Sequence, residues 1–201
     1  MAVEAAKERR NIRRDPALDC FWTPEWATRE LLQRELFPRW VWEPACGAGH
    51  ISTVLEEYGG YAAWCTDIAD HSPGTPLDEP PRDFLTYQGP PTIPESDPAR
   101  PIEAMVTNPP FTLATAFVDH AVNTLKLRKV AIFARVAMLE GAERHEKLFQ
   151  HQLLSRVWVF SRRVTMAHKD WQNAPEKGGQ MACAWFVFER GHRGGTIGWI
   201  S

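Results

Sequence analysis

The chain has 201 residues, of which 44% are hydrophobic, and this length and composition fit one domain with its own core. No apolar run approaches the roughly 20 residues that span a bilayer, and no apolar stretch follows the charged N-terminus, so we expect neither a membrane protein nor a secreted one. The four cysteines, Cys20, Cys46, Cys65 and Cys183, are scattered without a CxxC pair, which predicts no metal site, no disulfide framework and a cytoplasmic location.

The net charge is -2, but the charges are unevenly distributed along the chain. Residues 41–140 carry 6 basic and 13 acidic side chains, whereas residues 141–201 carry 9 basic and 5 acidic ones. A basic C-terminal part beside an acidic body could bind a polyanion. The alternative is an ordinary solvated surface of mixed charge.

The predicted elements alternate between strands and helices after a polar N-terminal arm at residues 1–20. Thr23 is predicted as the cap of the first helix, and residues 71–101 are predicted as a proline-rich loop with a short element at 83–85. Residues 196–200 are interpreted as a tail. The pattern predicts strands at 40–42, 61–65, 104–107, 129–134, 156–160 and 182–188, and helices at 23–36, 51–58, 112–127 and 142–152.

This alternation predicts an α/β fold with a mainly parallel sheet and helices on both faces. Such sheets bind ligands outside the carboxyl ends of their strands, so the loops after the strands are the candidate sites.

The first such loop is Glu-Pro-Ala-Cys-Gly-Ala-Gly-His, residues 43–50. Gly47 and Gly49 permit a tight turn and a close approach of a ligand to the backbone. The loop contains neither of the phosphate-binding motifs GxGxxG and GKS/T, which argues against a pyrophosphate or triphosphate ligand. Asp67 ends the next predicted strand, where a carboxylate can accept hydrogen bonds from ribose hydroxyls. Together, the glycine loop and Asp67 indicate a nucleoside ligand. The alternatives are that the loop is only a strand-to-helix turn and that Asp67 is a turn-former or helix cap. His50 could contact the ligand or only begin the helix.

The most specific pattern is Asn108-Pro109-Pro110-Phe111, directly after the strand predicted at 104–107. The lone pair of an amine conjugated with a base is a poor nucleophile, and two acceptors for its hydrogens would pull the nitrogen toward tetrahedral geometry. The side-chain oxygen of Asn108 and the carbonyl of Pro109 can supply them. The prolines stiffen the loop, and Phe111 offers a face for stacking. The alternative is an Asn that caps a helix after prolines that end a strand.

Four segments, at 21–24, 43–50, 66–68 and 108–111, together resemble the motifs of class I S-adenosylmethionine-dependent methyltransferases. The order of the motifs and the short chain are similar to small phage-type enzymes that methylate adenine N6 in DNA. The resemblance implies a single Rossmann-like domain at 21–201, doubly wound, with a mostly parallel seven-stranded sheet and an antiparallel C-terminal strand.

The same resemblance implies the roles of the residues in these motifs. Thr23 and Pro24 would contact the methionine part of S-adenosylmethionine, Asp67 the ribose, Ile68 the adenine ring and Asp83 the adenine amine. The implied cofactor-binding set is Phe21, Thr23, Pro24, Glu43, Pro44, Ala45, Cys46, Gly47, Gly49, Asp67, Ile68, Asp83, Phe84 and Asn108, and the implied catalytic set is Asn108, Pro109, Pro110 and Phe111.

The substrate is less sharply indicated than the chemistry. Our leading interpretation is adenine N6 in DNA, with the base flipped out of its stack. The rivals are a methyltransferase of RNA bases or protein glutamine, and a catalytically silent nucleic-acid-binding domain. Residues 162–181 are the predicted recognition insert, or else a solvated hairpin loop, and Arg135 could face substrate or be a surface residue. The insert's predicted substrate-binding residues are Arg162, Arg163, Lys169, Trp171 and Lys177.

Overall fold

The computed structural model describes residues 21–71, 74–94, 98–150, 153–168, 181–192 and 194–201. The predicted N-terminal arm at 1–20 therefore lies outside the described residues. Within the described ranges, every helix is too short or too polar to cross a lipid bilayer.

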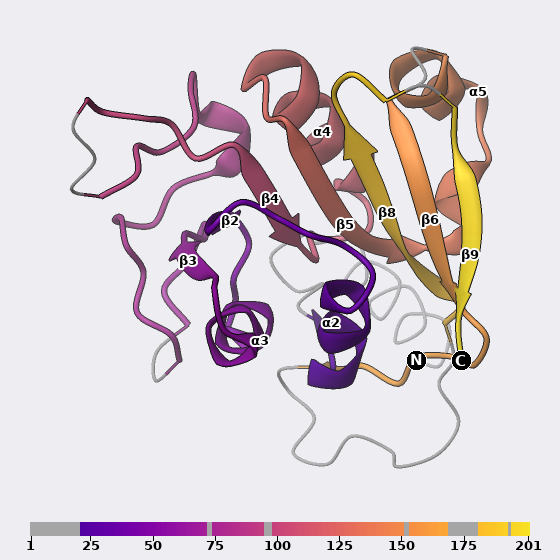
Figure 1. The fold of residues 1–201 in the computed structure, drawn as a ribbon, viewed down its shortest axis with the longest axis horizontal. Helices are drawn as coiled ribbons and strands as arrows, with labels where there is room; N and C mark the ends of the chain where they lie inside the picture. Colours follow the sequence, from indigo (N-terminus) through magenta and orange to yellow (C-terminus); the bar gives the residue numbers. More distant parts are fainter. Residues whose placement is uncertain (1–20, 72–73, 95–97, 151–152, 169–180, 193) are drawn as a thin grey trace, which may run out of the picture.

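A seven-stranded sheet forms the centre of the molecule, in the order β3-β2-β4-β5-β8-β6-β9 (Figure 1). All neighbouring pairs are parallel except those of β8, which runs antiparallel to both β5 and β6. This topology confirms the predicted Rossmann-like α/β fold class. The strands are β2 (Trp40–Glu43), β3 (Ala62–Cys65), β4 (Ala104–Thr107), β5 (Lys129–Arg135), β6 (Leu154–Phe160), β8 (Cys183–Glu189) and β9 (Thr196–Ile200).

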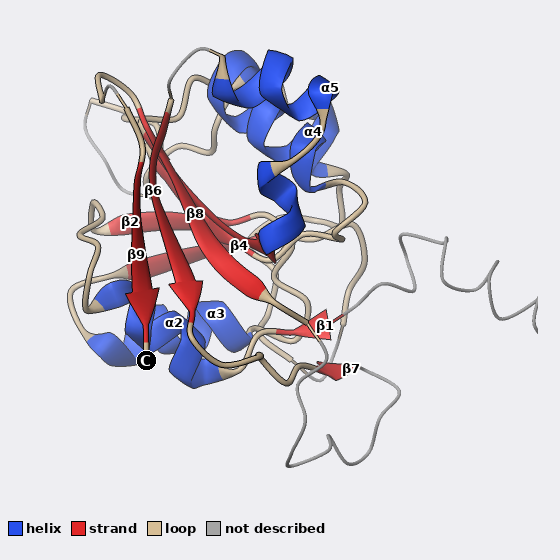
Figure 2. Ribbon diagram, turned by 90° about the vertical axis from the view of Figure 1, so that its right-hand side faces the viewer, coloured by secondary structure: helices blue, strands red, loops and turns tan. Residues whose placement is uncertain are grey.

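Helices cover both faces of this sheet, with α2 (Glu25–Leu32) and α3 (His50–Tyr58) on one face (Figure 2). The helices α4 (Ala114–Asp119) and α5 (Ala142–Arg144) lie on the other face. Side chains of β5 alternate between the two layers: Ile132 packs in the cluster beneath α4, while its neighbour Phe133 packs in the cluster beneath α2 and α3. The hydrophobic core is therefore two layers, one on each face of the sheet.

Two predicted helices change their winding part of the way along. After α4 the chain continues as the π-helix η3 (His120–Thr124), in which the amide of Leu125 donates to the carbonyl of His120 at 2.9 Å. After α5 it continues as the π-helix η5 (His145–Phe149). The spacing of apolar residues predicted that these segments are helical but not that they contain π-helical turns. A π turn shifts the hydrogen-bond spacing by only one residue, so the apolar pattern hardly changes.

The prediction that Thr23 caps the first helix is wrong. Pro24 occupies the cap position in an extended conformation, no side chain caps the helix, and α2 begins at Glu25. Thr23 is buried instead, and its Oγ1 finds no hydrogen-bond partner among the described residues. The proline thus precedes the first helical turn and turns the threonine inward.

Three strands were not predicted. The presumed tail is the edge strand β9, in which Gly198 lies against Trp158: a Cβ at Gly198 would stand 2.3 Å from the indole. The two-residue strands β1 (Phe21–Trp22) and β7 (Ala167–His168) pair antiparallel as a separate ribbon. Two-residue strands are too short to show a period of two in the sequence.

Three short elements complete the connections. They are the 3₁₀ helices η2 (Phe84–Thr86) and η4 (Val136–Leu139), and the isolated bridge between Val164 and Met181. The carboxyl group of Asp83 caps η2, since its Oδ1 accepts from the amide of Leu85 at 2.9 Å. The element predicted at 83–85 is therefore present, one residue further along the chain.

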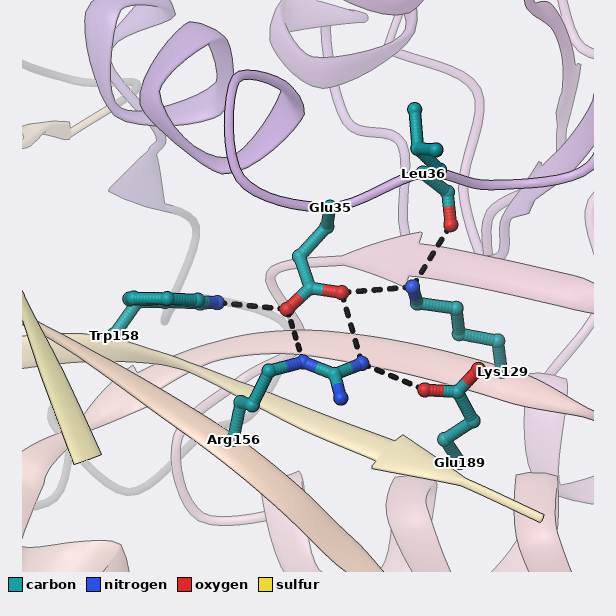
Figure 3. Close-up of polar contacts among 6 residues, drawn as sticks. All are labelled: Glu35, Leu36, Lys129, Arg156, Trp158 and Glu189. Atoms are coloured by element: carbon teal, nitrogen blue, oxygen red, sulfur yellow. Dashed lines mark hydrogen bonds and ion pairs between the residues drawn. The ribbon is translucent and has the colours of Figure 1, made fainter. Parts of the chain in front are cut away.

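A buried cluster of charges joins α2 to the amino edge of the sheet (Figure 3). The carboxylate of Glu35 accepts from Lys129 Nζ at 2.7 Å, from Trp158 Nε1 at 2.8 Å and from both Nε and Nη2 of Arg156. Arg156 also reaches Glu189, at 2.6 Å. The three strands β5, β6 and β8 are thereby tied to the chain segment that follows α2.

Candidate functional site

A pocket opens at the carboxyl edge of the sheet, beside the loops that follow β2, β3 and β4, where doubly wound sheets bind ligands. Its empty volume is about 980 Å³, which includes the open solvent at its mouth. Pro110 of the predicted catalytic loop lines it. The predicted cofactor-binding residues that line it are Phe21, Thr23, Glu43, Pro44, Ala45, Cys46, Gly47, Asp67, Ile68, Asp83, Phe84 and Asn108.

Four of the predicted cofactor-binding and catalytic residues are not in the pocket lining: Pro24, Gly49, Pro109 and Phe111. Conversely, the sequence interpretation missed Trp22, Ile51, Ala69, His71, Leu113 and Phe117. The sequence did contain a signal for the last two, because Phe117 follows Leu113 by four residues and so shares its helix face. Such spacing by itself indicates only core packing, in which Phe117 also takes part.

The glycine loop is held in shape by Asp67. Gly47 and Gly49 both have positive φ, of 54° and 85°. The amide of Gly47 donates to Asp67 Oδ2 at 2.8 Å, while Oδ1 accepts from the amide of Ala69 at 3.1 Å and contacts His71 Nε2 at 3.3 Å. Each carboxylate oxygen can accept more than one hydrogen bond, so both can still accept from a ligand in the pocket.

Gly49 contributes to the loop through close packing. A Cβ at Gly49 would lie 1.7 Å from Thr75 Oγ1, so any side chain there would collide with the segment that covers the loop. This explains why Gly49 is required by the turn and yet absent from the pocket wall.

Glu43 is the buried acidic group of the pocket, with a side chain that is 1% exposed. Its Oε2 has no hydrogen-bond partner among the described residues. Burial raises the pKa of Glu43 well above its usual range, and the nearby Cys65 thiol adds to the shift. A buried carboxyl group in a pocket wall, with one oxygen that has no partner among the described residues, is suited to a cationic or hydrogen-donating ligand.

Replacing Glu43 by glutamine should make the free protein less sensitive to alkaline pH. A raised pKa in the folded state means that stability is fully present below the ordinary value of 4.5 and is lost as pH rises through the folded pKa. Glu43→Gln cannot ionise, so its advantage over the wild type in urea unfolding should widen between pH 4.5 and pH 8. The control is Glu56→Gln on the exposed face of α3, and equal pH profiles for Glu43→Gln and the wild type would contradict the argument.

Asn108 lies where β4 ends, and its side-chain amide has a defined orientation. Its Nδ2 donates to the carbonyl oxygen of Phe21 at 2.9 Å. Because the amide is planar, this bond directs Oδ1 away from Phe21, and no donor among the described residues reaches that oxygen. The contact with Phe21 of β1 therefore leaves the Oδ1 atom of Asn108, which lines the pocket, available as a hydrogen-bond acceptor.

The ring of Phe111 lies behind this loop rather than in the pocket lining. It stacks on Phe21 with ring centroids 6.3 Å apart, and the guanidinium of Arg135 lies 5.5 Å from its centroid. Trp22 stacks on His50 at 4.8 Å. Burial lowers the pKa of His50, which keeps the imidazole neutral at neutral pH.

The predicted substrate-binding residues are only partly described. Arg162 and Arg163 are exposed just beyond β6, and the guanidinium of Arg162 lies 4.7 Å from the ring of Trp26. Lys169, Trp171 and Lys177 fall outside the described residues. In the part of the chain that is described, no group of three or more His, Cys, Asp or Glu side chains could hold a metal ion.

No protein-family model and no curated protein matches the sequence. Among solved structures, the chain is similar to a modification subunit assigned to a type I restriction enzyme of Vibrio vulnificus YJ016, with a TM-score of 0.58 and 14% identity. The match covers 99% of this chain and 50% of that one, so this chain spans half the length of that protein. At this identity the likeness shows the fold alone, which is the Rossmann-like α/β fold described above.

Two further solved structures give weaker matches. Protein 1320 of Thermoplasma acidophilum has a TM-score of 0.49 and 15% identity, covering 83% of this chain and 85% of that one. A predicted O-methyltransferase of Agrobacterium tumefaciens, protein Atu636, has a TM-score of 0.44 and 9% identity, covering 88% and 85%.

Proposed function

We propose that residues 21–201 form a single methyltransferase domain that uses S-adenosylmethionine to methylate the exocyclic N6 amine of adenine in DNA. The observation that supports this best is the orientation of Asn108. Its amide nitrogen is bound by the Phe21 carbonyl, so its oxygen is an unused acceptor at the wall of a pocket that also contains Asp67.

The residues of this pocket fit the two halves of S-adenosylmethionine. Asp67 can accept from ribose hydroxyls while it still holds the glycine loop. Ile68 is 64% exposed although it is a large aliphatic residue, and it offers an apolar face to an adenine ring. The unpartnered Oε2 of Glu43 suits the ammonium group of the methionine half.

Within this proposal the loop at 108–111 acts on the substrate amine. Bound S-adenosylmethionine supplies an electrophilic methyl group on a sulfonium. Asn108 Oδ1 and the Pro109 carbonyl each accept one hydrogen of the amine, which turns its lone pair out of conjugation with the base. Both prolines lack an amide hydrogen and restrict the loop, so the two acceptors stay fixed during transfer.

The charge distribution favours a nucleic acid as the substrate. The basic side chains Arg135 and Arg162 stand at the carboxyl edge of the sheet, Arg135 as the last residue of β5 and Arg162 just after β6, and both are exposed. Basic groups at the entrance of a site position a phosphate backbone, whereas a glutamine side chain in a protein would not require them. Adenine in DNA is our choice among bases because the order of the motifs resembles adenine-N6 enzymes.

The proposal is tested by supplying isotopically labelled S-adenosylmethionine with DNA, RNA or protein and analysing the products as nucleosides and peptides. We expect N6-methyladenine from DNA. Methylated RNA bases or methylglutamine would move the function to one of the rival substrates. Cofactor binding without transfer to any of the three would indicate a silent domain.

Replacing Asp67 by asparagine should weaken cofactor binding by about 10- to 100-fold, since a hydrogen bond to a charged acceptor is worth about 1.5–3 kcal/mol. The loss has two sources, the ribose acceptors and the bond that shapes the loop at Gly47. Titration of S-adenosylhomocysteine by calorimetry measures it. Asp119→Asn, which changes a carboxylate that contacts Asn123 at the end of α4, is the control and should bind normally. Equal affinities for both variants would remove Asp67 from the site.

A further inference from the structure

Arg135 ends β5, the strand that runs parallel to β4 in the sheet. The loop at 108–111 follows β4, so Arg135 and this loop leave neighbouring strands at the same edge. The guanidinium accordingly lies 5.5 Å from the centroid of the Phe111 ring, within the range of a cation–π contact. Its side chain is thereby placed next to the catalytic loop although it is not part of it.

The positive charge of Arg135 is not neutralised by a carboxylate among the described residues. Its hydrogen-bond partner is the thioether sulfur of Met181, at 3.3 Å, and a thioether is a weak acceptor. Some other arginines among the described residues do have acidic partners: Arg29 contacts Glu57, and Arg128 contacts Glu103. Arg135 therefore keeps most of its donors for a partner outside the chain.

The surroundings of Arg135 connect the catalytic loop to the predicted recognition insert. Met181 lies at the end of that insert and forms a bridge with Val164, near its beginning. From the same insert, β7 pairs with β1, where Phe21 stacks on Phe111 and binds Asn108. Arg135 thus stands between the two ends of the insert and the loop at 108–111.

We infer that Arg135 is a substrate-binding residue whose guanidinium binds the backbone phosphate of the nucleotide that enters the site. The cation–π contact with Phe111 keeps the guanidinium beside the catalytic loop. Its planar fork of N–H donors can form two parallel hydrogen bonds, the geometry that a phosphate accepts best. The inference rests on the proposed function, because it requires a nucleic-acid substrate. It adds a residue that contacts the substrate from β5, outside both the loop and the insert.

The test compares Arg135→Gln and Arg135→Lys with Arg128→Gln, which changes an arginine next to the opposite end of β5. Binding of a fluorescein-labelled single-stranded DNA of mixed sequence is measured by anisotropy, with S-adenosylhomocysteine present, over a range of NaCl concentrations. For Arg135→Gln we expect affinity to fall about 10-fold at low salt and the slope of log K against log salt to decrease by about 1. Arg135→Lys should keep the slope and lose part of the affinity, and Arg128→Gln should match the wild type.

An unchanged salt slope for Arg135→Gln would overturn the inference, and so would an equal loss in Arg128→Gln. Affinity for S-adenosylhomocysteine is measured alongside and should stay constant, because a purely structural role for the stack on Phe111 would change it. If the wild type binds DNA with the expected dependence on Arg135 but transfers no methyl group, the proposed reaction fails and the inference stands. If the wild type binds no nucleic acid, both fail.

Discussion

Replacing Asn108 by alanine should lower methyl transfer by about 10²- to 10³-fold, the usual cost of removing one fixed polar group that acts on the reacting centre. The side-chain oxygen is one of two proposed acceptors for the amine, and the Pro109 carbonyl cannot replace it. Cofactor affinity should change little, since Asp67 holds the glycine loop and is the residue proposed to bind the ribose. Single-turnover transfer to DNA and calorimetric titration of S-adenosylhomocysteine measure the two effects separately.

Asn108→Asp is the sharper control for the orientation of the amide. It preserves size and one oxygen for the amine but sets a carboxylate oxygen against the Phe21 carbonyl, which now accepts from Nδ2 at 2.9 Å. We expect an activity between those of the wild type and Asn108→Ala. Loss of cofactor binding in step with activity would show instead that Asn108 shapes the pocket and does not act on the substrate.

The parts of the site that the sequence could predict are those formed by neighbouring residues. A strand, the glycine loop and the helix α3 follow one another within 40–58, so the turn and its glycines can be identified from local pattern alone. The same holds for Asp67, which lies two residues after β3 and accepts from the amide of Gly47, in the loop after the adjacent strand β2.

Features formed by distant residues could not be predicted in this way. The orientation of Asn108 depends on Phe21, 87 residues earlier, and on a two-residue strand without any repeat. The position of Phe111 depends on Phe21 and Arg135, which both contact its ring outside the pocket lining. A single sequence contains the residue types for such contacts but no information on which of them meet.

The charge cluster around Glu35 is the largest feature of this kind. Its members come from the segment that follows α2 and from three strands, with Glu35 and Arg156 separated by 121 positions. In the sequence each charged residue of the cluster is one charge among many, and the simplest interpretation of each is a solvated surface side chain. The structure buries Glu35 to 3% exposure, beneath Arg156, Lys129 and Trp158 (Figure 3).

Burial alone would raise the pKa of Glu35, but hydrogen bonds from Arg156, Lys129 and Trp158 outweigh it and lower the pKa below its ordinary value of 4.5. The cluster therefore contributes stability at pH values above 4.5, and this stability is lost as pH falls through the lowered pKa. The cluster also lies at the amino edge of the sheet, opposite the pocket, so its effect on stability is separable from an effect on function.

Replacing Glu35 by alanine should destabilise the fold by about 3–5 kcal/mol at neutral pH, because it leaves the buried Lys129 and the half-buried Arg156 near each other without the carboxylate that they share. Glu57→Ala is the matched control, since it breaks the exposed pair with Arg29 and should cost less than about 1 kcal/mol. Urea unfolding at pH 7 measures both, and the gap between Glu35→Ala and the wild type should narrow in acid as Glu35 becomes protonated. A cost as small as that of Glu57→Ala would mean that water or Glu189 compensates the two cations. Transfer activity per folded molecule should remain that of the wild type, because none of these residues lines the pocket.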